Sequence, residues 1–203
     1  MLIGITGNFV AGKSAFARIL GMYRFKTIDA DRLAKDLYND PEIVEKIVAI
    51  FGESIAFEGK VDTDLLANIV FNNHEKRKKI EEIIHPLVRK KIEDFRLEHL
   101  SKEPEKIVFV EVPLLFEAKM ENLFDAIILV TSDTKTAMQR AINKGFTEGE
   151  FKRRREAQIP AEKLISKADF VIDTEGEIHQ LRGKVGKLIT EIEALAKKKG
   201  VGN

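Results

Sequence analysis

The stretch GNFVAGKS occupies residues 7–14 and has the form G-x-x-x-x-G-K-S. The apolar run MLIGIT at residues 1–6 precedes it, and residues 16–20 follow with apolar side chains at helical spacing. A glycine-rich loop between a buried strand and a helix presents backbone N–H groups and the positive helix end to a polyphosphate. The stretch therefore predicts a phosphate-binding loop for ATP or GTP, with Lys13 at the β- and γ-phosphates and Ser14 on a Mg²⁺ ion.

The candidate nucleotide-binding residues are the eight residues of this loop and the one that follows: Gly7, Asn8, Phe9, Val10, Ala11, Gly12, Lys13, Ser14 and Ala15. Three of them, Phe9, Val10 and Ala11, place side chains where the chain must turn tightly. A residue other than glycine is strained when its φ is positive. We therefore expect strain in the loop if one of these three adopts such a φ.

Composition and charge agree with a cytoplasmic enzyme. The chain has 203 residues and a net charge of +1, so no overall charge favours a nucleic acid or a membrane surface as a partner. The absence of cysteine excludes disulfides and cysteine-bound metals. No apolar stretch approaches the roughly 20 residues that a membrane span needs, and the first expected strand leaves no room for a signal peptide. The oligomeric state cannot be inferred from these features.

Apolar runs rich in β-branched residues predict strands at residues 1–6, 25–29, 106–112, 125–131 and 169–173. All but one of the connections between them are short and helical in pattern. Strands that are buried on both faces and joined by helices are typical of a parallel sheet. The sequence thus predicts an α/β fold with a five-stranded parallel sheet flanked by helices.

The exception is the long connection, residues 32–105, which contains several helical patterns. One is expected to begin at Asp40-Pro41 and to end at Gly52. Two more follow at residues 65–70 and 80–95. Because these helices are too many for one crossover, we interpret the connection as a helical insertion that forms one wall of a cleft for a second substrate.

Residues 1–31 and 106–203 are then expected to form the nucleotide-binding core. Within the core, residues 140–160 are rich in arginine and lysine and form a second candidate insertion, a mobile lid. Thr147 and Glu150 have the spacing of a capping box, which predicts the start of a short helix there.

Three carboxylates are expected near the phosphate loop. Asp29 and Asp31 lie at the carboxyl end of the second strand, and Glu111 lies at that of the third. In an open parallel sheet, this edge faces the ligand crevice. For phosphoryl transfer to an alcohol, one carboxylate accepts the proton and others hold Mg²⁺ or its waters. Two other roles remain open, because Asp31 suits the N-cap of a helix and Glu111 suits a solvated strand end.

Several stretches, in order and at similar spacing, resemble the dephospho-CoA kinase family. The resemblance runs from about residue 2 to 176, and it rests on the phosphate loop, Ile28-Asp29-Ala30-Asp31, Phe51-Gly52, residues 67–71, His85-Pro86, EVPLLFE at 111–117 and ADFVID at 168–173. It implies ATP-dependent phosphorylation of the ribose 3′-hydroxyl of 3′-dephospho-CoA, the last step to coenzyme A. It also implies a nucleoside-monophosphate-kinase-like core, a helical CoA domain and a lid.

The resemblance also assigns catalytic roles. It implies that Asp31 is the base for the 3′-hydroxyl and that Lys13 contacts the phosphates. Arg140 and Arg154 match lid arginines of the family. A guanidinium offers a fork of N–H donors, which suits the charge that grows on phosphoryl oxygens in the transition state. A solvated basic helix face remains the alternative for both arginines.

The substrate and metal sites follow from the same resemblance. The residues implied to bind the substrate are Asp31, His85, Leu114 and Glu117, and those implied to hold the metal are Ser14, Glu111 and Asp29. Without the resemblance, His85 is interpreted as a residue at a helix boundary, because Pro86 follows it.

The chain departs from the family pattern at five positions. Asn8 and Val10 replace loop glycines, Ala15 replaces a threonine, Glu111 an aspartate and Thr174 an asparagine. We expect the loop changes to affect ATP affinity, and the last change puts adenine contacts near residue 174 in question.

Other classes of protein remain possible on the sequence alone. One is a P-loop kinase that acts on a nucleoside monophosphate or a sugar. A second is a regulatory GTPase, although Asn143-Lys144-Gly145 is followed by Phe146 where guanine recognition requires an aspartate. A third is a nucleotide-binding protein without catalysis.

Overall fold

The computed structural model describes residues 1–71, 73–101 and 106–198. The chain divides into two compact units, one formed by Met1–Asp29 with Phe95–Asn203 and the other by Ala30–Asp94. Parts of the expected helical insertion, residues 72 and 102–105, lie outside the described residues. The assignment of a nucleotide core, a CoA-binding insertion and a lid stays a prediction.

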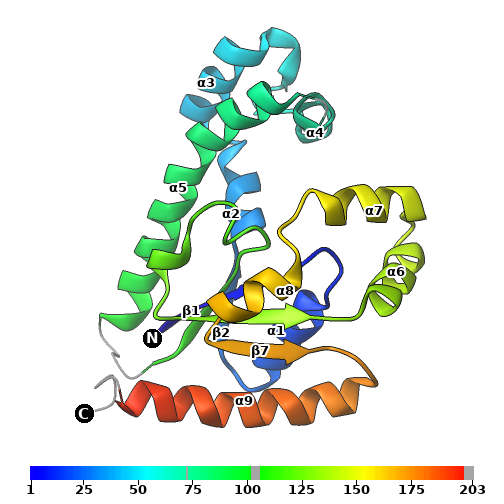
Figure 1. The fold of residues 1–203 in the computed structure, drawn as a ribbon. Coiled ribbons are helices and arrows are strands. Elements are labelled where there is room, and N and C mark those ends of the chain that lie inside the picture. Colours follow the sequence, from blue (N-terminus) through cyan, green and yellow to red (C-terminus); the bar gives the residue numbers. More distant parts are fainter. Residues whose placement is uncertain (72, 102–105, 199–203) are drawn as a thin grey trace. The chain divides into compact units, whose positions relative to one another are not determined.

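A five-stranded sheet is the centre of the first unit. Its strands are β1 (Leu2–Thr6), β2 (Lys26–Asp29), β5 (Val108–Glu111), β6 (Ala126–Thr131) and β7 (Phe170–Asp173). They are arranged in the order β2-β5-β1-β6-β7, and every neighbouring pair is parallel (Figure 1). The predicted parallel sheet is confirmed. Because β1 is central, the loop after it opens at the middle of the carboxyl edge.

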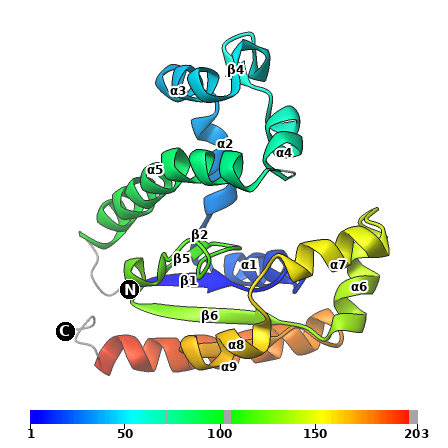
Figure 2. The same ribbon diagram turned by 45° about the horizontal axis from the view of Figure 1, so that its top comes forward.

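Two helices, α1 (Lys13–Met22) and α9 (Ile178–Lys198), pack against this sheet together (Figures 1 and 2). Phe16 of α1 and Val185 of α9 are fully buried in the same apolar cluster as Ile128 of β6. This packing fixes the amino end of α1, and therefore the end of the phosphate loop, against the sheet.

Three short helices follow β6 in the region of the expected lid: α6 (Thr134–Asn143), α7 (Glu148–Glu156) and α8 (Ala161–Leu164). The capping box of α7 is confirmed. The backbone N–H of Glu150 donates to the Thr147 hydroxyl at 3.2 Å, and the Thr147 N–H donates to the Glu150 carboxylate at 2.8 Å. Figure 2 shows α6 and α7 in contact beyond the carboxyl end of β6.

The second unit is mainly helical, with α2 (Ala30–Leu37), α3 (Pro41–Phe51) and α4 (Thr63–Phe71) followed by most of α5 (His74–Leu100). The predicted limits of α3 are confirmed. The Asp40 carboxylate caps its first turn by accepting the N–H of Glu42 at 3.0 Å, and Gly52, with a φ of 90°, ends it.

A β-hairpin in this unit did not appear in the sequence-based prediction. Strands β3 (Ala56–Phe57) and β4 (Lys60–Val61) pair in antiparallel fashion. The two residues between them, Glu58 and Gly59, both have positive φ values, 49° and 75°. Positive φ at both central positions is the geometry of a two-residue hairpin turn. The strands are too short for an alternating pattern to be visible in the sequence.

The longest helices, α5 and α9, have 27 and 21 residues. Pro86 lies inside α5, so the interpretation of His85 as a helix-boundary residue was wrong. Proline removes one backbone hydrogen bond and disfavours the helix, but the buried side chains Ile84 and Val88 hold the turns on both sides in the unit's core. Within the described residues, no helix is long and apolar enough to cross a membrane.

Candidate active site at the phosphate loop

The phosphate loop turns from β1 to α1 through two glycines that have no room for a side chain. A Cβ on Gly7 would lie 2.2 Å from the carbonyl oxygen of Val130, and a Cβ on Gly12 would lie 2.7 Å from the Thr174 hydroxyl. Gly12 also has a φ of 100°. Glycine is therefore required at position 7 by strand β6 and at position 12 by Thr174, the residue after β7, independently of any nucleotide.

Lys13 folds back over this loop. Its ammonium group donates to the carbonyl of Gly7 at 2.7 Å and to that of Asn8 at 3.2 Å, and only 9% of the residue is exposed. Ser14 follows in the first turn of α1 and is exposed. The amino end of α1 carries the partial positive charge of the helix dipole, so a lysine, a helix end and a hydroxyl converge where an anion would bind.

The expected strain in the loop is present at Val10. Its φ is 59°, in the left-handed region that β-branched residues rarely adopt. Such a conformation costs about 1–3 kcal/mol and persists only where the surroundings enforce it. The surroundings here are apolar, because Val10 packs with Phe9 against a buried cluster of Ala137, Ala141 and Phe151.

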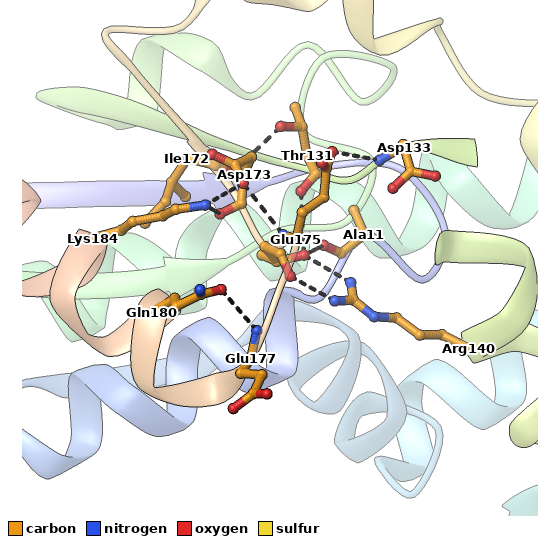
Figure 3. Close-up of polar contacts among 11 residues, drawn as sticks. Ala11, Thr131, Asp133, Arg140, Ile172, Asp173, Glu175, Glu177, Gln180 and Lys184 are labelled. Atoms are coloured by element: carbon orange, nitrogen blue, oxygen red, sulfur yellow. Dashed lines mark hydrogen bonds and ion pairs between the residues drawn. The ribbon is translucent and has the colours of Figure 1, made fainter. Parts of the chain in front are cut away.

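A polar contact attaches the loop at Ala11 to the residue that follows β7 and to Arg140 of α6 (Figure 3). The Thr174 hydroxyl donates to the carbonyl of Ala11 at 2.7 Å and accepts Nη1–H of Arg140 at 2.7 Å. Nη2 of Arg140 donates to the Thr174 carbonyl at 2.6 Å. Thr174 is 2% exposed, so its bond to the Ala11 carbonyl is shielded from water. One threonine thus joins the loop and the predicted catalytic arginine.

An aromatic contact attaches the other side of the loop to α7. The Phe9 ring meets the Phe146 ring edge to face, with centroids 5.1 Å apart. The guanidinium carbon of Arg154 lies 5.1 Å from the Phe9 centroid and 5.0 Å from the Phe146 centroid. These are cation–π distances. Arg154 is exposed, yet its position is defined by two rings, one of them in the phosphate loop.

The segment after α7 is also bonded to the loop. The Phe9 N–H donates to Oε1 of Gln158 at 2.6 Å, and the Asn8 side-chain amide donates to the carbonyl of Ile159 at 2.9 Å. The N–H of Ile159 in turn donates to the Glu117 carboxylate at 3.0 Å. Asn8, one of the departures from the family pattern, is therefore used to hold the loop to this segment.

Two of the predicted metal ligands lie side by side. Asp29 ends β2, Glu111 ends β5, and the two residues are direct partners in the sheet register. With the Ser14 hydroxyl they are oxygen donors, the ligand type that Mg²⁺ prefers. The described residues contain no cluster of three or more acidic or histidine side chains suited to a metal. Mg²⁺ in nucleotide sites is usually held by one or two carboxylates with phosphates and water, so this donor set fits the ion.

Asp31 and His85 belong to the second unit. Asp31 is exposed in the first turn of α2, which begins at Ala30, so Asp31 is not the N-cap. The pKa of Tyr38 is raised by burial and, to a lesser degree, by the charge of Asp31. The pKa of His85 is lowered, chiefly by burial and against the opposing effect of Glu81. His85 is therefore neutral at neutral pH and suited to hydrogen bonding rather than to charge pairing.

The remaining predicted substrate residues have different surroundings. Leu114 is 45% exposed, whereas the Glu117 carboxylate accepts the backbone N–H of Ile159. Sequence reasoning missed the structural roles of Thr174, Gln158 and Phe146. The one available signal was the position of Thr174 directly after a predicted strand, at the edge of the sheet where ligands bind.

The strand order and the G-x-x-x-x-G-K-S loop between β1 and α1 define the chain as a P-loop kinase. A family model described as dephospho-CoA kinase matches residues 1–180. The chain belongs to the dephospho-CoA kinase family.

Individual relatives agree with this family. A dephospho-CoA kinase of Fusobacterium nucleatum is 34% identical over 194 residues, which cover 95% of this chain and 98% of the relative. The structure of a dephospho-CoA kinase from Campylobacter jejuni superimposes with a TM-score of 0.72 at 32% identity, covering 95% of this chain and 97% of that one. A shikimate kinase from Acinetobacter baumannii, at 14% identity and a TM-score of 0.52, shares the fold alone.

Proposed function

We propose that the chain transfers the γ-phosphoryl group of ATP to the ribose 3′-hydroxyl of 3′-dephospho-CoA, which yields coenzyme A and ADP. The observation that carries this proposal is the family match over residues 1–180, together with an intact Lys13 and Ser14 in the phosphate loop. In this step, the acceptor oxygen forms a bond to the γ-phosphorus, the bond to the β–γ bridging oxygen breaks, and ADP leaves. The hydroxyl proton needs an acceptor.

ATP would place its phosphates on the loop at residues 7–14 and at the amino end of α1. Lys13 already lies over the loop, where its ammonium contacts two carbonyl oxygens. When ATP binds, β- and γ-phosphate oxygens would replace those carbonyls as partners of the ammonium group. Ser14, Glu111 and Asp29 would hold Mg²⁺, which supplies charge neutralisation on the phosphates when bound.

The acceptor side of the proposal rests on Asp31, His85, Leu114 and Glu117. Asp31 stands two residues beyond the last residue of β2 and is exposed, as a carboxylate that accepts the 3′-hydroxyl proton must be. Residues 32–105 would supply the CoA-binding insertion. Residues 140–160 would act as a lid that excludes water and that carries Arg140 and Arg154, whose guanidinium groups would contact the transferring phosphoryl group. The cytoplasmic location expected from the sequence stays a prediction.

The first experiment incubates the protein with MgATP, with and without 3′-dephospho-CoA, and measures coenzyme A and ADP together. Equal amounts of both, formed only with the acceptor, are expected. ADP formed without an acceptor, or a preference for GTP, would instead indicate a nucleotide hydrolase. Turnover only with a different small alcohol such as shikimate would indicate another P-loop kinase.

The Asp31→Asn variant tests the base. Loss of a general base typically lowers turnover by about 10²–10⁴-fold, and ATP binding should change little. Asp36→Asn is the matched control, because Asp36 is another exposed aspartate on α2. Equal turnover in Asp31→Asn and Asp36→Asn would remove Asp31 from this role.

Lys13→Ala should weaken ATP binding and slow transfer together.

A further inference from the structure

Arg154 lies on α7, a helix that consists largely of charged residues, and a solvated, mobile side chain is the usual state of an arginine in such a place. Its guanidinium instead rests against Phe9 and Phe146 at 5.1 and 5.0 Å. Two rings that also contact each other give this exposed side chain a defined position.

The position of the Phe9 ring is in turn set by the loop. The ring packs against the cluster of Ala137, Ala141 and Phe151, and its centroid lies 6.4 Å from that of Phe151. The Phe9 backbone is tied to Gln158 by a 2.6 Å hydrogen bond. A change in the loop at residue 9 is therefore transmitted directly to the surface on which Arg154 rests.

A cation–π contact suits an arginine that must still bind a ligand. It is an attraction between the charge and the ring, and it engages no N–H donor in a hydrogen bond to oxygen. A side chain that is already ordered also loses less conformational entropy when it binds. The contact thus orders the Arg154 guanidinium and leaves its N–H donors available for a ligand.

We propose that Phe9 is a positioning residue, whose ring holds the Arg154 guanidinium in the place from which it contacts the transferring phosphoryl group. This inference rests on the proposed phosphoryl transfer. The phosphate loop then does two things: its backbone binds the nucleotide, and one of its side chains orders an arginine of the lid.

The kinetic test is a double-mutant cycle with Phe9→Leu, Arg154→Ala and the double variant. A cation–π contact is worth about 3- to 30-fold in rate when it acts at the transition state, so Phe9→Leu should lower kcat by that factor. The KM for ATP should change by less than about threefold, since the loop backbone remains. In the Arg154→Ala background, Phe9→Leu should have no further effect on kcat.

Phe25→Leu is the matched control, because it makes the same exchange at a half-buried phenylalanine that packs on Phe109 in another apolar cluster and does not support the rings that contact Arg154. Its kcat should stay near that of the unmodified protein after correction for any unfolded fraction. An unchanged kcat in Phe9→Leu, or the same loss with and without Arg154, would overturn the proposal, because the ring would then act on the loop alone.

A second measurement does not depend on activity. Protons of Arg154 that lie over two aromatic rings should be shifted upfield in the NMR spectrum by the ring currents, with the signal assigned by its loss in Arg154→Lys. Phe9→Leu should reduce this shift, and Phe25→Leu should keep it. A normal shift in the unmodified protein would overturn the positioning role. Absence of coenzyme A formation with the shift present would instead count against the proposed reaction.

Discussion

The phosphate loop is attached to its surroundings in two places that use different chemistry. At Ala11, a buried threonine hydroxyl joins the loop to Arg140 through hydrogen bonds of 2.7 Å. At Phe9, aromatic rings join the loop to Arg154 at cation–π distances. Each attachment holds one of the two arginines that were predicted to act in catalysis.

The two attachments differ in how many N–H donors of the arginine stay available for a phosphate. In the contact with Thr174, Nη1 and Nη2 of Arg140 each donate a hydrogen bond. The contact therefore fixes the orientation of the guanidinium group, but it occupies N–H donors that could otherwise bind a phosphate. The cation–π contact with Phe9 engages none of the N–H donors of Arg154 in a hydrogen bond to oxygen. We infer that Arg140 has fewer N–H donors left for a phosphate than Arg154, because two of its five already bond to Thr174.

The largest effect is expected from Arg140, whose removal breaks the polar attachment and the proposed phosphate contact together. Arg140→Ala should lower kcat by about 10²–10³-fold, the usual loss for one stabilising donor group. Arg140→Lys should recover little, because an ammonium cannot reproduce the guanidinium fork. Steady-state kinetics with Lys135→Ala as a control on the same helix would check this. If the Arg140→Ala variant stays active, the contact between Arg140 and Thr174 has a structural role only.

A smaller effect is expected from Thr174→Val, which keeps the shape of the side chain and removes its hydroxyl. The Ala11 carbonyl then loses a donor and Arg140 loses an acceptor in a buried place. We expect the free energy of unfolding to fall by about 1–3 kcal/mol and the KM for ATP to rise. Urea unfolding and kinetics measure the two. Thr174→Ser retains the hydroxyl and should behave like the unmodified protein; if both variants behave alike, the hydroxyl does not hold the loop.

The smallest effect is expected at the strained residue beside the aromatic attachment. Removing two methyl groups in Val110→Ala, in the buried strand β5, should cost about 2–3 kcal/mol. Val10→Ala removes the same groups from a half-buried site and also relieves part of a backbone strain of about 1–3 kcal/mol, so its cost should stay below about 1 kcal/mol. Urea unfolding of both variants gives the comparison. Equal costs would mean that Val10 is not strained.

Local features of the site were predictable because their causes lie close together in the sequence. The capping box at Thr147 and Glu150 spans three residues, and the limits of α3 depend on Asp40 and Gly52 at its own ends. The strain at Val10 could be predicted only conditionally. The chain must turn tightly in the loop, and a β-branched residue there is strained if its φ is positive. The hairpin at residues 56–61 was not predictable, because two-residue strands carry no detectable pattern.

The sequence by itself determined the α/β fold class, the parallel sheet and the residues of the phosphate loop. These depend on periodicity and on one contiguous motif, and both are local properties. Only the tertiary structure decided which residues hold that loop. Thr174 meets Ala11 across 163 residues of sequence, and Gln158 meets Phe9 across 149. The physical reason is that such pairs form when the sheet brings distant strand ends to one edge, and no short-range pattern records which side chains then face each other.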